Sequence, residues 1–164
     1  MNSDMQEEDR RYRRVCGSFA TGVVVISTIH ADGRMSGITV NSWTSVSLSP
    51  RLILWCLGHD SARYDAFAAA ELWGVTVLGA DEGDLARRYA RIATETILPG
   101  EADFISGAPV LKGGIAHFSC RTYDRHTAGD HVVVVGEVLD FTSRDGDALT
   151  FFRGGYGRAA PGEV

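Results

Sequence analysis

The chain has 164 residues, 45% of them hydrophobic, which fits one folded domain over residues 1–164 with a core over roughly residues 12–158. Its net charge is −5 and its basic residues are scattered, so its electrostatics do not favour binding to nucleic acid. No segment approaches the ~20 continuous apolar residues of a membrane span, and the polar N-terminus is unlike a secretory signal. Three widely spaced cysteines favour reduced thiols in a cytoplasmic protein.

The first predicted element is an amphipathic helix over residues 7–19. Its apolar face recurs at helical spacing and comprises Tyr12, Val15, Cys16 and Phe19. The basic residues of this helix alternate with acids just upstream, which is typical of a solvated face. These basic residues are Arg10, Arg11, Arg13 and Arg14.

A β-branched strand is predicted over residues 23–28, and "ADGR" at 31–34 is a hairpin signal. The next strand enters the stretch "GITVNSWTSVSLSP", residues 37–50. Its two ends alternate as a strand does, but a run of amide and hydroxyl side chains, residues 41–45, interrupts the pattern. A core strand has no need of such a run. The following segment, "RLILWCL" at 51–57, is predicted to be a buried strand.

The stretch "HDSARYDAFAAA" predicts a helix with Asp60 or Ser61 as its N-cap. A strand over 72–78 and a short helix over 81–91, with Asp81 as its cap, come next. The segment 92–111 contains two prolines and two glycines and is expected to be irregular, with room for a flexible lid.

Four more strands are predicted, over residues 115–123, 131–139, 141–143 and 149–152. Strands therefore outnumber helices, and hairpin connections favour antiparallel pairing. This pattern predicts a mainly β (α+β) fold, an antiparallel β-barrel with peripheral helices, rather than a doubly wound α/β fold.

Several common site motifs are missing. The sequence has neither a G-x-x-x-x-G-K-[ST] phosphate loop nor a G-x-G-x-x-G that follows a strand. His126, Asp130 and His131 are close in sequence, but their spacing matches no helical metal-ligand pair, so no metal site is predicted. Hydrolytic nucleophile motifs such as G-x-S-x-G are also absent. A metal hydrolase is kept as a distant third alternative.

Two features remain as candidates for function. One is the polar run at 41–45, and the other is "GDHVVVVGEV" at 129–138, where a turn feeds a long apolar strand. His131 stands at the entrance of that strand, a common position for functional groups. Taken alone, His131 is more simply interpreted as a solvated turn residue.

Together these features resemble the flavin reductase-like family, the FMN-binding split β-barrel that includes reductase components of two-component flavin monooxygenases. The resemblance covers roughly residues 12–158. Five segments match in order: "FATGVVVIST", "GITVNSWTSVSLSP", "HDSARYDAF", "LWGVTVLGADEGDLARRYA" and "GDHVVVVGEV". The chain departs from the family in having Trp43 where phenylalanine is frequent and Tyr64 where threonine is frequent.

The resemblance implies a site for each part of the chemistry. The flavin ring would be lined by Thr39, Asn41, Ser42, Trp43 and Thr44, with backbone groups of Cys56 and Leu57. The flavin phosphate would be held by Ser61 at a helix N-terminus and by Arg88, with Arg63 and Arg87 as alternatives. His131 would contact the nicotinamide dinucleotide. Apart from the resemblance, Tyr156 could close over the site, and a plain aromatic packing role near the C-terminus is an equal alternative.

The resemblance thus implies an NAD(P)H:flavin oxidoreductase that passes reduced flavin to a partner monooxygenase and forms a homodimer. FMN and FAD both remain open as the flavin, as do NADH and NADPH as the reductant. The alternative is a module that binds flavin or haem in the same barrel without turnover. The histidine of the GDH motif favours the enzyme, because a flavin store has no need of a pyridine nucleotide contact.

Overall fold

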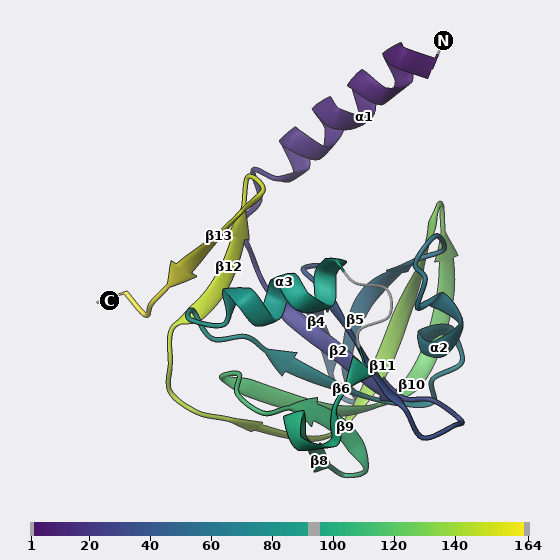
Figure 1. Cartoon of the computed structure of the whole chain (residues 1–164), viewed down its shortest axis with the longest axis vertical. Helices are drawn as coiled ribbons and strands as arrows, with labels where there is room; N and C mark the ends of the chain where they lie inside the picture. Colours follow the sequence, from purple (N-terminus) through teal and green to yellow (C-terminus); the bar gives the residue numbers. More distant parts are fainter. Residues whose placement is uncertain (1, 92–95, 163–164) are drawn as a thin grey trace.

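The computed structural model describes residues 2–91 and 96–162 (Figure 1). Its largest sheet has eight strands, and each neighbouring pair is antiparallel. In spatial order they are β4 (Thr44–Leu48), β5 (Arg51–Gly58), β11 (His131–Ser143), β10 (Ala116–Ala128), β6 (Leu72–Val77), β2 (Val24–Ile29), β3 (Met35–Val40) and β7 (Thr96–Ile97). Within the described residues the edge strands β4 and β7 do not pair with each other, so the sheet curves without closing.

Two smaller sheets complete the β structure. One contains β1 (Thr21–Gly22), β12 (Ala148–Phe152) and β13 (Gly155–Ala159), and the other contains β8 (Ala102–Ile105) and β9 (Ala108–Leu111). The helices α1 (Asn2–Cys16), α2 (Tyr64–Ala68), α3 (Gly83–Arg91) and the 3₁₀ turn η1 (Pro99–Glu101) lie around the sheets. The predicted antiparallel β fold with peripheral helices is therefore confirmed. None of the described helices combines the length and apolar content needed to cross a membrane.

Alternation along β5 explains how the core forms. Trp55 and Leu57 are fully buried, and each such side chain stabilises the fold by about 1.5–3 kcal/mol. Trp55 meets Phe67 of α2 edge-on at 5.7 Å and Trp73 of β6 at 6.0 Å. Gly136 on β11 leaves room for the Trp73 ring, because a Cβ atom there would collide with it.

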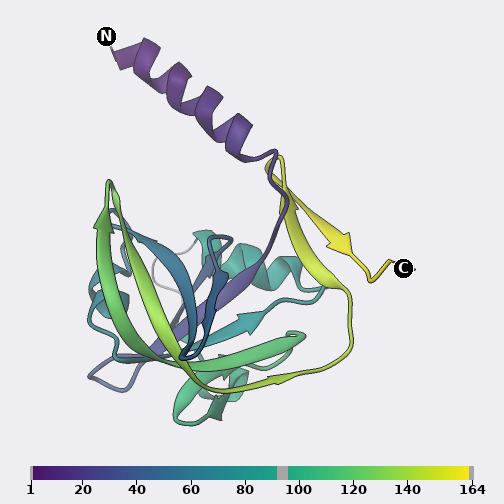
Figure 2. The ribbon, with the colours of Figure 1, turned by 180° about the vertical axis from the view of Figure 1, so that it is seen from behind.

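Helix α1 differs from the predicted element in its bounds and surroundings. It begins at Asn2 and ends at Cys16, where the amides of Gly17, Ser18 and Phe19 turn back to carbonyls of the last turn. Figures 1 and 2 show that it projects away from the sheets. Its apolar face is consequently exposed, with Tyr12 at 69% and Val15 at 67% of their full accessible surface.

Both predicted helix starts after β5 and β6 are wrong. Helix α2 begins at Tyr64, and its N-cap position, Arg63, makes no side-chain capping bond. Neither Asp60 nor Ser61 caps it, because the intervening residues form a tight turn in which the Ser61 amide donates to the Gly58 carbonyl at 3.1 Å. Helix α3 begins at Gly83, and Asp81 pairs with Arg158 at 2.7 Å instead of capping the helix.

The prediction of an irregular lid over 92–111 is also corrected. Residues 92–95 lie outside the described residues, but β7, η1 and the β8–β9 hairpin occupy the rest. Proline is tolerated in this hairpin because β9 has a single strand neighbour within the described part of the chain. The separate strand predicted at 141–143 is the end of β11, which bends at bulges in its pairing with β10. Strand β13, which pairs with β12, was not predicted.

Candidate functional site

The polar run lies in the connection between β3 and β4. Val40 ends β3 and Thr44 begins β4, so Asn41, Ser42 and Trp43 form the loop. The Ser42 hydroxyl oxygen accepts a hydrogen bond from the Cys56 amide of β5 at 3.0 Å. Ser42 therefore holds the loop against β5, while Asn41 and Thr44 remain exposed.

This loop forms one wall of a cavity of about 620 Å³. The cavity is lined by Phe19, Ala20, Thr21, Gly22, Val24, Asn41, Ser42, Trp43, Thr44 and Val77. Its size falls within the range of small-molecule sites, and apolar side chains are combined with a few polar ones, as such sites require. Sequence reasoning missed the wall at residues 19–22, because "FATG" was interpreted only as the start of a strand.

A smaller cavity of about 160 Å³ adjoins the first, and both are lined by Asn41. Its walls include Thr39 of β3 and Tyr156 of β13, two predicted site residues that are far apart in sequence. Tyr156 packs edge-on against Phe151 at 5.6 Å, and the Arg87 guanidinium lies over its ring at 5.3 Å. The C-terminal hairpin therefore closes one side of the predicted flavin loop.

The Thr39 hydroxyl donates to the Ala86 carbonyl of α3 at 2.8 Å. This bond holds α3 beside the end of β3. Arg88 lies on the same helix, two residues after Ala86. Arg88 donates from both terminal nitrogens to the Glu101 carboxylate, at 2.6 and 3.2 Å. The hydrogen bond from Arg88 lowers the pKa of Glu101, and the amide of Leu98 contributes in the same direction.

The alternative cations predicted for the phosphate are also engaged. Arg87 pairs with Asp84 at 2.7 Å on the exposed face of α3. Arg63 is buried and donates to the Tyr89 carbonyl at 3.1 Å. A phosphate at Arg88 would compete with a carboxylate that already accepts two charge-assisted hydrogen bonds.

His131 begins β11, opposite Gly58 at the end of β5. When the ring is neutral, Nδ1–H donates to Asp130 Oδ1 at 2.7 Å, which leaves Nε2 as the acceptor. This hydrogen bond is the largest cause of a lowered pKa at Asp130. A Cβ atom at Gly58 would lie 3.4 Å from Nε2, so glycine keeps that nitrogen accessible.

Strand β5 joins the two halves of the predicted site. Cys56 is bonded to the loop through Ser42, and Gly58, two residues further and about 7 Å along the strand, lies beside His131. Leu57 between them is fully buried, so only its backbone is available to a ligand. Ser61 reaches the same end through its bond to Gly58.

The Ser61 hydroxyl accepts from the Arg63 amide at 3.3 Å, within a turn that precedes α2. Helix α2 therefore does not begin at Ser61, and the dipole argument for a phosphate there is lost. The described residues contain no group of three side chains placed to hold a metal ion. The buried Cys120 thiol has its pKa raised to about 12 by desolvation, which makes it unreactive.

The fold is an open antiparallel barrel with a cavity at the β3–β4 loop, and comparison with known proteins identifies its family. The sequence profile described as "Flavin reductase like domain" matches residues 16–160, so the chain belongs to the flavin reductase-like family.

Among curated relatives, FMN reductase (NADH) SmoA of Agrobacterium fabrum is 42% identical over 153 residues, covering 93% of this chain and 87% of SmoA. The NADH-dependent FAD reductase of Streptomyces globisporus is 37% identical over 161 residues, covering 91% and 85%. The reductase component of the trigonelline monooxygenase of Acinetobacter baylyi is 34% identical, and this chain spans 50% of its length.

Solved structures show the same fold. The flavin reductase PheA2 superposes with a TM-score of 0.85 at 34% identity, covering 93% of this chain and 99% of PheA2. The NADH:FAD oxidoreductase SgcE6 of Streptomyces globisporus C-1027, in complex with NAD and FAD fragments, superposes with a TM-score of 0.84 at 34% identity, covering 94% of each chain. The split antiparallel barrel is therefore the fold of this chain.

Proposed function

We propose that this chain is an NAD(P)H:flavin oxidoreductase that reduces FMN or FAD and supplies the reduced flavin to a partner monooxygenase. The observation that carries the proposal is the 620 Å³ cavity at the β3–β4 loop, joined through β5 to the accessible imidazole of His131. In this proposal residues 1–164 form one domain that carries the activity.

The cavity fits a flavin ring in its chemistry. Apolar walls at Val24 and Val77 suit the dimethylbenzene end, and Asn41 offers both a donor and acceptors to the pyrimidine edge. Two polar atoms of cavity residues, Thr21 Oγ1 and Trp43 Nε1, are buried without a hydrogen-bond partner among the described residues. Unpaired buried polar groups are costly, and a ring rich in acceptors supplies partners for such groups.

When bound, the flavin accepts two electrons and a proton, as a hydride, from the reduced nicotinamide. The protein's contribution is to place the two rings in contact, about 3–3.5 Å apart, and to exclude water. The β3–β4 loop orients one ring, and Tyr156 covers it from the C-terminal hairpin. Neither task requires a general acid or base.

His131 is assigned to the nicotinamide dinucleotide. Asp130 holds the Nδ1–H tautomer, so Nε2 can accept a hydrogen bond from a nicotinamide carboxamide or a ribose hydroxyl. Arg88 is assigned to the flavin phosphate. Its planar guanidinium can bind two phosphate oxygens once the phosphate displaces the Glu101 carboxylate. Ser61 supplies a hydroxyl and an amide near His131.

The proposal is tested by following NADH and NADPH oxidation with added FMN or FAD. Turnover with either flavin supports the enzyme, and the ratio of kcat/KM values identifies the flavin and the nucleotide. Flavin or haem binding without NAD(P)H oxidation would instead establish the non-catalytic alternative. Transfer of reduced flavin is tested by coupling the chain to a monooxygenase that lacks its own reductase.

A homodimer is the second part of the proposal. Helix α1 carries an apolar stripe, Met5, Tyr12, Val15 and Cys16, that nothing covers among the described residues. Exposed apolar stripes of this kind mark interfaces between chains.

The cellular location follows from the same reasoning. The three cysteines are free in the structure, and the reaction consumes reduced pyridine nucleotide. We therefore infer a cytoplasmic protein, which fractionation of cells that express the chain would test.

A further inference from the structure

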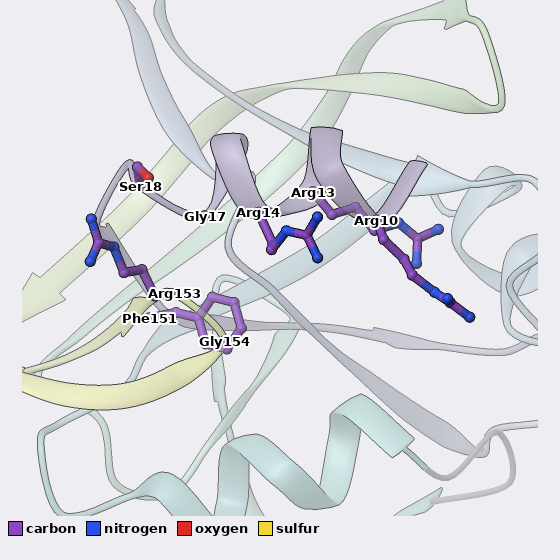
Figure 3. Close-up of a pocket in the computed structure, with 8 residues that line it drawn as sticks. All are labelled: Arg10, Arg13, Arg14, Gly17, Ser18, Phe151, Arg153 and Gly154. Carbon is purple, nitrogen blue, oxygen red and sulfur yellow. The ribbon is translucent and has the colours of Figure 1, made fainter. Parts of the chain in front are cut away.

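A third cavity, of about 870 Å³, lies between α1 and the β12–β13 hairpin (Figure 3). It is lined by Arg10, Arg13, Arg14, Gly17, Ser18, Phe151, Arg153 and Gly154. Four of these eight residues are arginines, although the chain as a whole carries a net charge of −5. Such a local excess of positive charge concentrates anions against the field of the whole molecule.

The four guanidinium groups are not neutralised by their neighbours. Glu7 pairs with Arg10 at 3.7 Å and with Arg14 at 3.3 Å, and both pairs are exposed, so each contributes little. Neither Arg13 nor Arg153 has a carboxylate partner among the described residues. The cavity thus keeps about three uncompensated positive charges after its single carboxylate neighbour is counted.

The backbone at Arg153 is in an unusual conformation for a residue with a side chain. Arg153 and Gly154 both have positive φ angles, 48° and 82°, at the tip of the hairpin. Turns of this shape favour asparagine or aspartate before glycine, because other side chains strain the backbone by about 1–2 kcal/mol. Arg153 therefore stands in a sparsely populated conformation at the wall of the basic cavity, with its guanidinium over the Phe152 ring at 5.1 Å.

The cavity also adjoins the proposed flavin site. Phe151 lines both this cavity and the small cavity that holds Thr39 and Tyr156. Ser18 lines this cavity, and the next residue, Phe19, lines the 620 Å³ cavity. Figure 3 shows the Phe151 ring below the arginines of α1, where it offers an apolar surface next to the charges.

We propose that this cavity binds the adenylate end of a dinucleotide, with the arginines on the adenylate phosphate and Phe151 against the adenosine. This inference rests on the proposed function, since FAD and NAD(P)H both carry that moiety and both would act at the adjoining site. FMN lacks the adenylate, so the cavity would favour FAD if it serves the flavin.

The direct test is titration of the full chain with ADP by calorimetry at low ionic strength, without turnover. Arg13→Gln and Arg153→Gln should each weaken ADP binding by about threefold to tenfold, the scale of one charge-assisted contact. The matched control is Arg11→Gln, which removes the same charge from the same helix but pairs with Glu8 and does not line the cavity. Arg11→Gln should change ADP affinity by less than about twofold.

Two further variants separate binding from folding. Glu7→Gln removes the competing carboxylate and should tighten ADP binding by about twofold to threefold. Arg153→Gly removes the guanidinium and also relieves the strained backbone, so its Tm should hold or rise while ADP affinity falls. A misfolded variant would instead show both a lower Tm and a lower ADP affinity.

The source of the moiety is decided by steady-state kinetics on Arg153→Gln. A raised KM for FAD with the KM for FMN unchanged assigns the cavity to the flavin, and a raised KM for NADH with either flavin assigns it to the nicotinamide nucleotide. The inference is overturned if ADP fails to bind the wild-type chain, or if Arg11→Gln weakens it as much as Arg153→Gln. A chain that reduces FMN with NADH but does not bind ADP would leave the proposed function intact.

Discussion

At the scale of single residues, two side chains that are close in sequence have separate tasks. Asn41 faces the cavity, whereas Ser42 uses its hydroxyl to hold the Cys56 amide of β5. A polar run between two strands therefore combines one group for a ligand with one for the fold, and only the hydrogen-bond partners distinguish them.

We expect Asn41→Ala to weaken flavin binding by roughly 1 kcal/mol or more, about fivefold, because it removes one or two hydrogen bonds. Ser42→Ala should instead lower the free energy of unfolding by about 1 kcal/mol, since it leaves the Cys56 amide unpaired. Flavin fluorescence quenching and denaturant unfolding measure the two effects. Ser45→Ala, on the exposed part of β4, is the control, and unchanged flavin affinity in Asn41→Ala would remove the loop from the site.

His131→Ala should raise the KM for NAD(P)H by roughly 5- to 30-fold, the value of a hydrogen bond worth about 1–2 kcal/mol, and leave flavin affinity nearly unchanged. An equal fall in kcat and kcat/KM would instead place its role in the transition state. His126→Ala, on the same β10–β11 hairpin, should change neither the KM for NAD(P)H nor kcat. A folded His131→Ala protein with wild-type KM and rate would leave the nicotinamide site without an anchor.

At the scale of elements, α3 and the segment after β7 are joined by the pair of Arg88 and Glu101. The pKa of Glu101 is lowered in the folded state, so its carboxylate stabilises the fold above its ordinary pKa of about 4.3. That contribution is lost as the pH falls through the lowered pKa. Because both side chains are about one-third exposed, the stabilisation is at most about 1 kcal/mol.

Glu101→Gln should therefore be less stable than the wild type near pH 7, and the two unfolding curves should converge below about pH 4. The same change removes the carboxylate that competes for Arg88, so FMN binding should tighten while riboflavin binding, without a phosphate, stays the same. Thermal unfolding across pH and the two titrations check both statements. Tighter binding of riboflavin and FMN alike would show that Arg88 does not contact the phosphate.

At the scale of the whole molecule, α1 stands apart from the sheets (Figure 2). Its apolar stripe is exposed in the described structure. Val15→Glu should convert the proposed dimer into a monomer, because a buried charge at an interface core is costly. Light scattering measures the mass. Arg11→Gln, which alters a charged residue of the same helix outside the stripe, is the control and should leave the mass unchanged.

A wild-type monomer at micromolar concentration, or a dimer that survives Val15→Glu, would contradict the proposal that α1 forms the interface. The variant is expected to stay folded, because Val15 lies outside the two buried clusters of the sheets. Its far-ultraviolet circular dichroism should therefore match that of the wild type.

Much of the fold was predictable because its signals are local. The continuous apolar run in "RLILWCL" specified β5 as a buried strand, and the Asp-Gly turn specified the β2–β3 hairpin, where Gly33 has a φ of 83°. Family membership was likewise predictable, since five short segments keep their order along the chain. The helix starts were missed because Asp60, Ser61 and Asp81 are good caps by type, and competing local turns and ion pairs determine their use.

The sequence by itself determined the antiparallel β class, the polar loop at 41–45 and the GDH turn, because each depends on neighbouring residues. Only the tertiary structure decided that residues 19–22 face the loop, that Tyr156 returns to it through β13, and that Glu101 occupies Arg88. It also decided that the arginines of α1 share a cavity with Arg153. These contacts join residues far apart in the chain, and long-range packing, rather than any local pattern, brings them together.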